Sequence, residues 1–138
     1  MVVFTIKGQP MGKQRPKFST FGGYIKTYTP KETVNYETLV KLSYQQQCKE
    51  YFGESQIYMF IKAYYQIPKS YSKKKANECL SGNLRPTTKP DCDNIAKIIA
   101  DSLNGVSFAD DKQIVDMRIE KYYAIEPKVV VEIGELKC

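Results

Sequence analysis

The sequence predicts an α+β fold in which helices pack on a small mixed β-sheet, and three observations support this prediction. Segments rich in β-branched and aromatic residues alternate along the chain with segments of helical periodicity. The length of 138 residues suits one domain, which we expect to span residues 1–138. No repeat, low-complexity stretch or apolar run of membrane-spanning length interrupts this order.

The chain is expected to begin with a strand over residues 2–7, which carries apolar side chains on both faces. The glycines and prolines of residues 8–23 predict a long irregular loop that carries Lys13, Arg15 and Lys17. Loops of this length inside a compact domain are often functional.

A helix is expected over residues 28–47. Thr29 is the candidate N-cap, and Pro30 suits the first helical position because a missing N–H costs nothing there. The helix carries a broken apolar stripe formed by Val34, Tyr36, Leu39, Val40 and Leu42.

The later helices and strands have clearer start and stop signals in the sequence. In chain order we expect a strand at 56–67, a short helix from about 72 to Gly82, a helix at 93–104 closed by Gly105, and strands at 113–123 and 128–133. The strand at 113–123 alternates apolar and charged residues, so one of its faces should be wet. We expect it to pair with the last strand across the turn at Glu126 and Pro127.

The composition excludes several kinds of chemistry. The chain has no histidine, which rules out Ser-His-Asp and Cys-His catalysis and histidine-dependent nucleases. The cysteines have no paired metal-ligand spacing, which argues against structural zinc; they are Cys48, Cys79, Cys92 and Cys138. Because no signal peptide is visible, we expect free thiols in a reducing cytoplasm.

The net charge of +6 is concentrated in two basic blocks with aromatic residues in or near them. This pattern is typical of nucleic-acid binding, although an ordinary solvated surface explains it about as well. The candidate DNA-binding residues are Lys13, Arg15, Lys17, Lys73, Lys74, Lys75 and Lys89.

Carboxylates gather around the helix at 93–104. On a helical wheel its apolar residues share one side, namely Ile95, Ile98, Ile99 and Leu103. The opposite side holds Asp93, Lys97, Asp101 and Asn104. Asp91 directly precedes the helix, and Asp110 and Asp111 lie in the turn before the next strand.

Each of these acids has an ordinary explanation. An aspartate at a helix start is a favoured cap, adjacent aspartates are common in turns, and Lys97 four residues after Asp93 is a typical surface pair. Taken together they favour a metal site, because Mg²⁺ binds carboxylates, waters and phosphate oxygens. A basic, histidine-free chain with an acidic cluster suits metal-assisted phosphodiester hydrolysis.

The segment "KPDCDNIAKIIADSLNG", followed by "ADDKQIVDMRIEK", resembles the RusA family of Holliday junction resolvases, which is common in phages and prophages. The family pattern is D-x-D-N-x-x-K-x-x-x-D-x-L, a short spacer and then D-D-x-Q-[IV]. This chain matches at Asp91, Asp93, Asn94, Lys97, Asp101, Leu103, Asp110, Asp111 and Gln113. The beginning of the chain also resembles family members from Gram-positive bacteria and their phages.

The resemblance implies a RusA-like fold and a site. Asp91, Asp93 and Asp111 would be the catalytic, metal-binding carboxylates, Lys97 the essential lysine, and Asp110 a possible additional acid. The cofactor would be Mg²⁺, with Mn²⁺ as a substitute. The protein would be a homodimer that cuts four-way DNA junctions symmetrically in recombination and repair, in the cytoplasm of a bacterial host, and would have no membrane partner.

Two other functions fit the residues. The chain could be a basic nucleic-acid-binding module whose acidic cluster is structural, or a Mg²⁺-dependent nuclease without junction preference. Metal-dependent nicking of junction DNA separates the first from an enzyme, and competition between junction and linear duplex separates the second from a resolvase.

Overall fold

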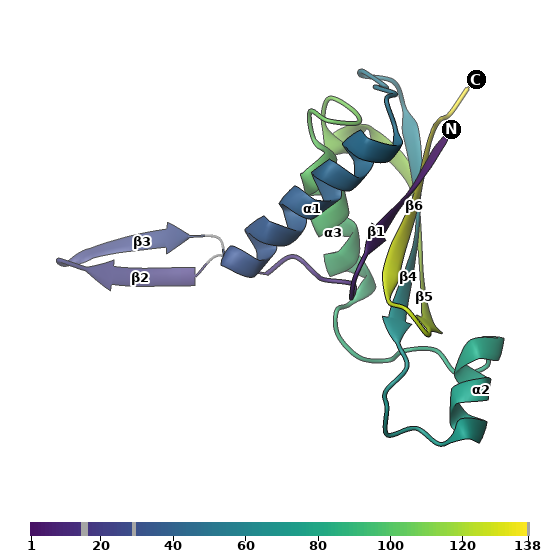
Figure 1. Cartoon of the computed structure of the whole chain (residues 1–138). Helices are drawn as coiled ribbons and strands as arrows, with labels where there is room; N and C mark the ends of the chain where they lie inside the picture. The colour runs from purple at the N-terminus through teal and green to yellow at the C-terminus, as the bar shows by residue number, and fades with distance from the viewer. Residues whose placement is uncertain (15–16, 29, 138) are drawn as a thin grey trace.

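The structure is a computed structural model, and it describes residues 1–14, 17–28 and 30–137. Helices lie against a mixed sheet, so the predicted α+β fold is confirmed (Figure 1). The strands are β1 (Val2–Lys7), β2 (Lys17–Phe21), β3 (Tyr24–Tyr28), β4 (Ile57–Gln66), β5 (Ile114–Ala124) and β6 (Lys128–Glu135). The helices are α1 (Lys31–Gln47), α2 (Lys73–Ser81), α3 (Cys92–Leu103) and the 3₁₀ turn η1 (Asp111–Gln113).

The described strands of the main sheet follow the order β1-β6-β4-β5. β4 is parallel to β5 and antiparallel to β6, and β6 also pairs antiparallel with β1. The expected direct pairing between β5 and β6 is therefore wrong, because β4 lies between them. β4 is apolar enough to occupy this central place, where both of its edges are hydrogen-bonded.

Alternation along β4 decides which face of the sheet is covered. Ile57, Met59 and Ile61 are buried, whereas Tyr58 and Phe60 between them are only partly buried. Successive side chains of a strand point to opposite faces. The buried set faces α1 and α3, which lie over the same face of the sheet (Figure 1).

α3 supplies the apolar side that its helical wheel predicted. Ile95, Ile98, Ile99 and Leu103 each have 0% exposure and belong to the main core. Burial of apolar surface stabilises a fold by roughly 25 cal/mol per Å², so the burial of these side chains fixes the helix on the sheet. The charged side of α3 is therefore held in a defined orientation.

The stripe expected on α1 is only partly buried. Tyr36 and Val40 are in the core, but Val34, Leu39 and Leu42 are 40–49% exposed. α1 packs on β1 and α3 along one side only, and the small residues Thr33 and Ser43 are buried there instead. Pro30 is the N-cap rather than the first helical residue, and the proposed N-cap, Thr29, lies outside the described residues.

The long loop expected at 8–23 in fact contains a strand. β2 pairs with β3 in an antiparallel hairpin that extends away from the body (Figure 1). Gly22 and Gly23 form its two-residue turn, with φ of 62° and 82°. Two consecutive residues with positive φ match the type I′ turn that joins twisted strands, so the Gly-Gly pair was the signal for a hairpin.

α2 has the predicted ends. The Ser72 hydroxyl accepts a hydrogen bond of 3.2 Å from the Lys75 N–H, and Gly82 closes the helix with φ of 86°. Cys48, Cys79 and Cys92 are free thiols, as predicted, while Cys138 lies outside the described residues. Among the described helices, none combines the length and apolar character that crossing a membrane requires.

Candidate functional site

The start of α3 is fixed from the sheet. The Tyr65 hydroxyl, on β4, donates a hydrogen bond of 2.7 Å to the carbonyl oxygen of Pro90. Asp91 follows as the N-cap, and its carbonyl accepts the Ile95 N–H at 3.0 Å. The Asp91 carboxylate, however, makes no capping hydrogen bond and is exposed. The ordinary capping explanation therefore does not account for this carboxylate.

The segment before β2 docks directly on α3. The Lys13 N–H donates to the Asn94 carbonyl at 3.1 Å. A Cβ added to Gly12 would lie 2.9 Å from the Cβ atoms of Asn94 and Pro90, so this close approach requires glycine. Beside the contact lies a pocket of about 390 Å³ that is lined by Lys13, Lys89 and Asp91, among others.

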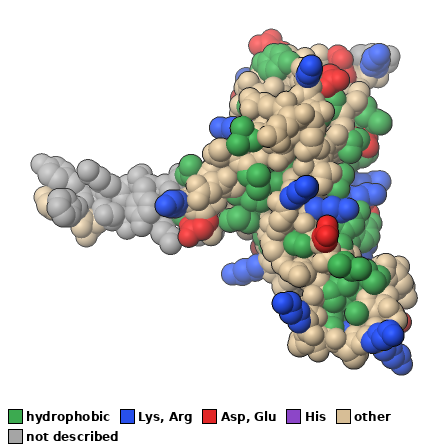
Figure 2. Space-filling view, viewed as in Figure 1, with side chains coloured by type: hydrophobic (Ala, Val, Ile, Leu, Met, Phe, Trp, Pro, Cys, Tyr) green, Lys and Arg blue, Asp and Glu red, His purple; other side chains and the backbone are tan. Residues whose placement is uncertain are grey.

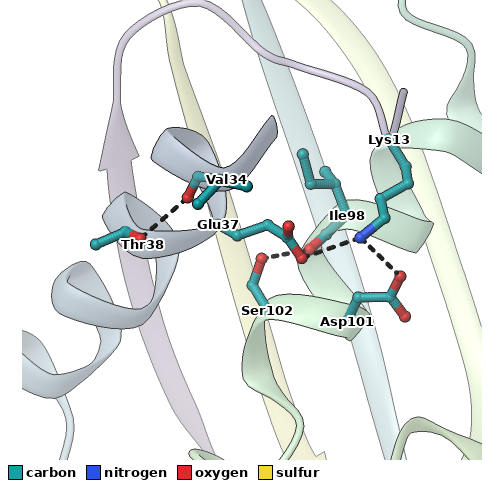
Figure 3. A network of polar contacts seen from close by, with 7 residues as sticks. All are labelled: Lys13, Val34, Glu37, Thr38, Ile98, Asp101 and Ser102. Atoms are coloured by element: carbon teal, nitrogen blue, oxygen red, sulfur yellow. Dashed lines mark hydrogen bonds and ion pairs between the residues drawn. The ribbon is translucent and has the colours of Figure 1, made fainter. Parts of the chain in front are cut away.

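Lys13 is held by two carboxylates (Figure 3). Its Nζ lies 3.1 Å from Glu37 on α1 and 3.4 Å from Asp101 on α3. Burial disfavours the charge of Lys13, but the hydrogen bond and charge of Glu37 and the charge of Asp101 outweigh burial and raise its pKa. Lys13 thus ties the N-terminal segment to two helices, a role that the sequence did not indicate.

Asp110 and Asp111 form a second acidic group. Their side chains share a hydrogen bond, which lowers the pKa of Asp110 and raises the pKa of Asp111. Burial and the charges of Asp110 and Asp101 raise the pKa of Asp111 further. The pair therefore favours holding one proton, or another cation, between its carboxylates.

Gln113 anchors this acidic turn. Its Oε1 accepts the Asp110 N–H at 2.9 Å, and its Nε2 donates to the carbonyls of Gly53 and Ser55 at 2.8 and 2.7 Å. One side chain thus fixes η1 against the segment that leads into β4. The motif glutamine therefore has a structural role in this chain, which is to hold the acidic turn in place.

The predicted metal ligands fall at two places. Asp91 and Asp93 lie in the first turn of α3, while the charge of Asp101, ten residues after Asp91, acts on Asp111. Ten helical residues correspond to about 15 Å. Among the described residues, no three acidic or thiol side chains are grouped closely enough to hold a metal ion. The structure therefore does not bring Asp111 together with Asp91 and Asp93.

The predicted lysines also differ in their surroundings. Lys97 is exposed on the polar side of α3, and the described part of the chain shows no ion pair between it and Asp93. Lys89 is exposed beside Asp91 and lines the pocket there. Arg15 lies outside the described residues, and the side chain of Lys17 is not described.

The lysines of α2 form a separate basic surface. Lys73, Lys74 and Lys75 occupy the first turn of this helix and are exposed. The Nζ of Lys75 lies 4.0 Å from the ring centroid of Tyr71. Figure 2 shows Lys and Arg side chains at the surface of the part of the molecule that contains α2.

Sequence reasoning missed Gly12, Glu37 and Tyr65. Each acts through a contact distant in sequence, with Asn94, Lys13 and Pro90 respectively. The only local signal was the glycine between Met11 and Lys13 in a basic segment.

Comparisons with known proteins identify the family of this chain. The chain is 37% identical over 139 aligned residues to YqaN, an uncharacterized protein of Bacillus subtilis strain 168, covering 99% of this chain and 98% of that protein. The family model described as endodeoxyribonuclease RusA matches residues 7–134, which include α3, the acidic turn and the whole basic surface. The chain therefore belongs to the RusA endodeoxyribonuclease family, whose members are hydrolases that cut phosphodiester bonds within DNA.

Proposed function

We propose that this endodeoxyribonuclease resolves four-way DNA junctions by paired, symmetric cleavage that depends on Mg²⁺. The observation that carries the proposal is the Asp91 carboxylate, which caps nothing and lies beside a pocket lined by Lys13 and Lys89. An exposed carboxylate in a pocket that lysines also line suits a site where a metal ion meets a phosphate.

The chemistry of the donors at the start of α3 fits Mg²⁺. Asp91 and Asp93 offer hard oxygen ligands on one exposed turn, and Mg²⁺ commonly takes one or two carboxylates and completes its shell with waters and phosphate oxygens. When bound, Mg²⁺, or Mn²⁺ in its place, would supply a water activated for attack and stabilise charge on the phosphate. The DNA itself would complete a site that the protein leaves open.

The remaining site residues have separate proposed roles. Lys97, one turn after Asp93, would neutralise the phosphate or orient the attacking water. Asp111 and Asp110 are proposed as further metal-binding carboxylates on the strength of the motif alone. Asp111 lies near Asp101 and not in the first turn of α3, so a test of whether this acidic pair contributes to cleavage is especially informative.

Binding to the DNA backbone is proposed for the exposed lysines. Lys89 lies beside the candidate metal site, and Lys73, Lys74 and Lys75 lie on α2. Arg15 and Lys17 remain proposed contacts. Lys13 is proposed to meet phosphate only together with the carboxylates that hold it, so its net attraction is smaller than that of a free lysine.

Symmetric cleavage of two strands calls for two sites related by a twofold axis, so we propose a homodimer. Light scattering should give about twice the 15.9 kDa chain mass. A monomeric mass that persists with junction DNA present would contradict the dimer. We further propose action in recombination and repair inside a bacterial cell, with a phage or prophage origin of the gene.

The decisive experiment incubates the full chain with a labelled four-way junction in Mg²⁺, in Mn²⁺ and in EDTA. We expect paired nicks at symmetric positions with either metal and none in EDTA. A linear duplex of the same arm sequence is the matched competitor. Equal cleavage of junction and duplex would replace junction resolution with the alternative of a nuclease without junction preference. Unpaired nicks would contradict symmetric cleavage.

A further inference from the structure

We propose that the pocket walled by Tyr65, Tyr71 and Tyr123 binds a single unpaired nucleobase at the DNA branch point. The inference rests on the proposed function, because it assigns a substrate group to the surface next to the candidate metal site. It adds a base-binding subsite, which would hold the base of the nucleotide next to the cut.

The pocket has the size and lining of a small-molecule site. Its volume is about 340 Å³, near the lower end of the roughly 300–1,000 Å³ that ligand pockets occupy. Its walls include three tyrosines and the prolines Pro68 and Pro90, and no acidic side chain lines it. A flat aromatic ligand suits such walls, whereas a duplex does not fit the volume.

The tyrosines contribute ring surface to the pocket, because their hydroxyls already have partners. The Tyr65 hydroxyl donates to Pro90, and the side chains of Tyr71 and Tyr123 share a hydrogen bond. The rings of Tyr71 and Tyr123 meet edge to face with centroids 6.2 Å apart, and both residues line the pocket. Tyr65 is fixed by its hydrogen bond to Pro90. Stacking of a base on aromatic side chains is tolerant of sequence, so ring surface alone is enough to bind an unpaired base.

The tyrosine-lined pocket lies next to the pocket that contains Asp91, and this position indicates how a nucleotide would bind. Lys89 and Pro90 line both this pocket and the pocket that contains Asp91 and Lys13. A nucleotide with its base among the tyrosines would carry its phosphate past Lys89 toward Asp91. The charge of Lys89 complements that phosphate, and the Lys75 ammonium, 4.0 Å from the centroid of the Tyr71 ring, adds positive potential near the pocket.

The test measures binding without metal, so that it does not depend on cleavage. Two junctions differ at one bulged position at the branch point, which holds thymidine in one and an abasic nucleotide in the other. Because neither position is paired, the comparison isolates the base. Anisotropy should show that the wild-type chain binds the thymidine junction about tenfold more tightly, as one stacked base supports.

Variants assign this preference to the pocket. Tyr71→Ala should remove it, and Tyr71→Phe, which keeps the ring, should retain it. The matched control is Tyr64→Ala, which removes one ring of the Tyr64–Tyr122 pair, 5.6 Å between centroids, on the opposite face of the sheet. The control should keep the preference. A preference that survives in Tyr71→Ala, or is missing from the wild type, overturns the proposal.

If the Tyr71→Ala variant does not fold, a second measurement on the wild-type chain still tests the proposal. A 5-iodouracil at the bulged position should crosslink on irradiation to Tyr71, Tyr123 or Tyr65, as mapped by peptide mass spectrometry. Crosslinks confined to other residues overturn the proposal. A chain that prefers the thymidine junction but cuts no junction would contradict the proposed function and support base binding in the pocket. Failure of the proposed function can therefore be distinguished from failure of the base-binding proposal.

Discussion

The Nζ of Lys13 lies 3.4 Å from the carboxylate of Asp101, where the N-terminal segment contacts α3. Glu37 of α1 approaches the same ammonium at 3.1 Å (Figure 3). Two residues that sequence reasoning assigned to a DNA contact and to a helix surface are thus partners. The basic N-terminal segment is held against the helix that carries the candidate metal site.

The Lys13–Asp101 ion pair should contribute measurably to stability. Both side chains are about three-quarters buried, so the pair is screened less than a surface pair. A double-mutant cycle with Lys13→Met and Asp101→Asn should give a coupling of about 1 kcal/mol in urea unfolding. The distant control pair Lys41→Met and Asp116→Asn should be additive. A coupling of zero would mean that Glu37 alone holds Lys13.

Asp91→Asn should abolish cleavage and spare folding. The change keeps the size of the side chain but removes a charge needed to hold Mg²⁺, so the cleavage rate should fall by roughly a thousandfold or more. Because the Asp91 carboxylate makes no capping bond, the unfolding free energy should change by less than about 0.5 kcal/mol. Single-turnover cleavage and urea unfolding measure the two effects.

The control for Asp91→Asn is Asp116→Asn, which changes another exposed aspartate, on β5. It should cut junctions at the wild-type rate. Junction binding in EDTA should persist in Asp91→Asn, since the variant loses only a negative charge near phosphate. A folded Asp91→Asn chain with wild-type cleavage would refute the catalytic assignment.

Asp111→Asn separates a metal ligand from a structural acid. If Asp111 holds Mg²⁺, cleavage should fall as in Asp91→Asn. Stability should rise slightly at neutral pH, because the pKa of Asp111 is raised by its hydrogen bond with Asp110 and asparagine resembles the protonated form. A raised pKa means that the contribution of wild-type Asp111 is full at acid pH and is lost as the pH rises through its folded pKa.

The difference in unfolding free energy between Asp111→Asn and wild type should therefore shrink toward acid pH, as a urea series between about pH 3 and 7 would show. A difference that grows toward acid pH would contradict the shared hydrogen bond. Unchanged cleavage in the variant would confine the metal site to the first turn of α3.

Gln113→Ala should destabilise the acidic turn. The side chain satisfies the N–H of Asp110 and the carbonyls of Gly53 and Ser55, and losing these partners should cost about 1–3 kcal/mol. Urea unfolding measures the loss. Gln46→Ala, an exposed position on α1, should change stability by less than about 0.5 kcal/mol. Equal stabilities of the two variants would mean that the anchor is dispensable.

Lys73→Ala/Lys74→Ala should reduce the salt dependence of junction binding. Each lost phosphate contact lowers the slope of log K against log salt by about 0.9, so the double variant should lose about 2. Both lysines are exposed, and neither makes an ion pair among the described residues, so folding should be unaffected. Lys41→Ala/Lys49→Ala is the charge-matched control on another surface, and the same slope in both variants would place α2 away from the DNA.

Short-range patterns in the sequence were enough to predict most of the helices and strands and the family. The wheel of α3 placed Ile95, Ile98 and Leu103 in the core, and the caps at Ser72 and Gly82 bounded α2, because periodicity and capping depend on neighbouring residues. The acidic motif indicated the family for the same reason, since its spacing is written along one helix and one turn.

The way in which distant segments meet could not be predicted from short-range patterns. β4 lies between β5 and β6, with its backbone hydrogen-bonded to one of them on each edge, and no local pattern reveals which strand will occupy that place. The Lys13 ion pairs, the Gly12 contact with Asn94 and the tyrosine-lined pocket likewise join residues far apart in the chain. Such contacts depend on the packing of the whole core, which fixes where each loop returns to the site.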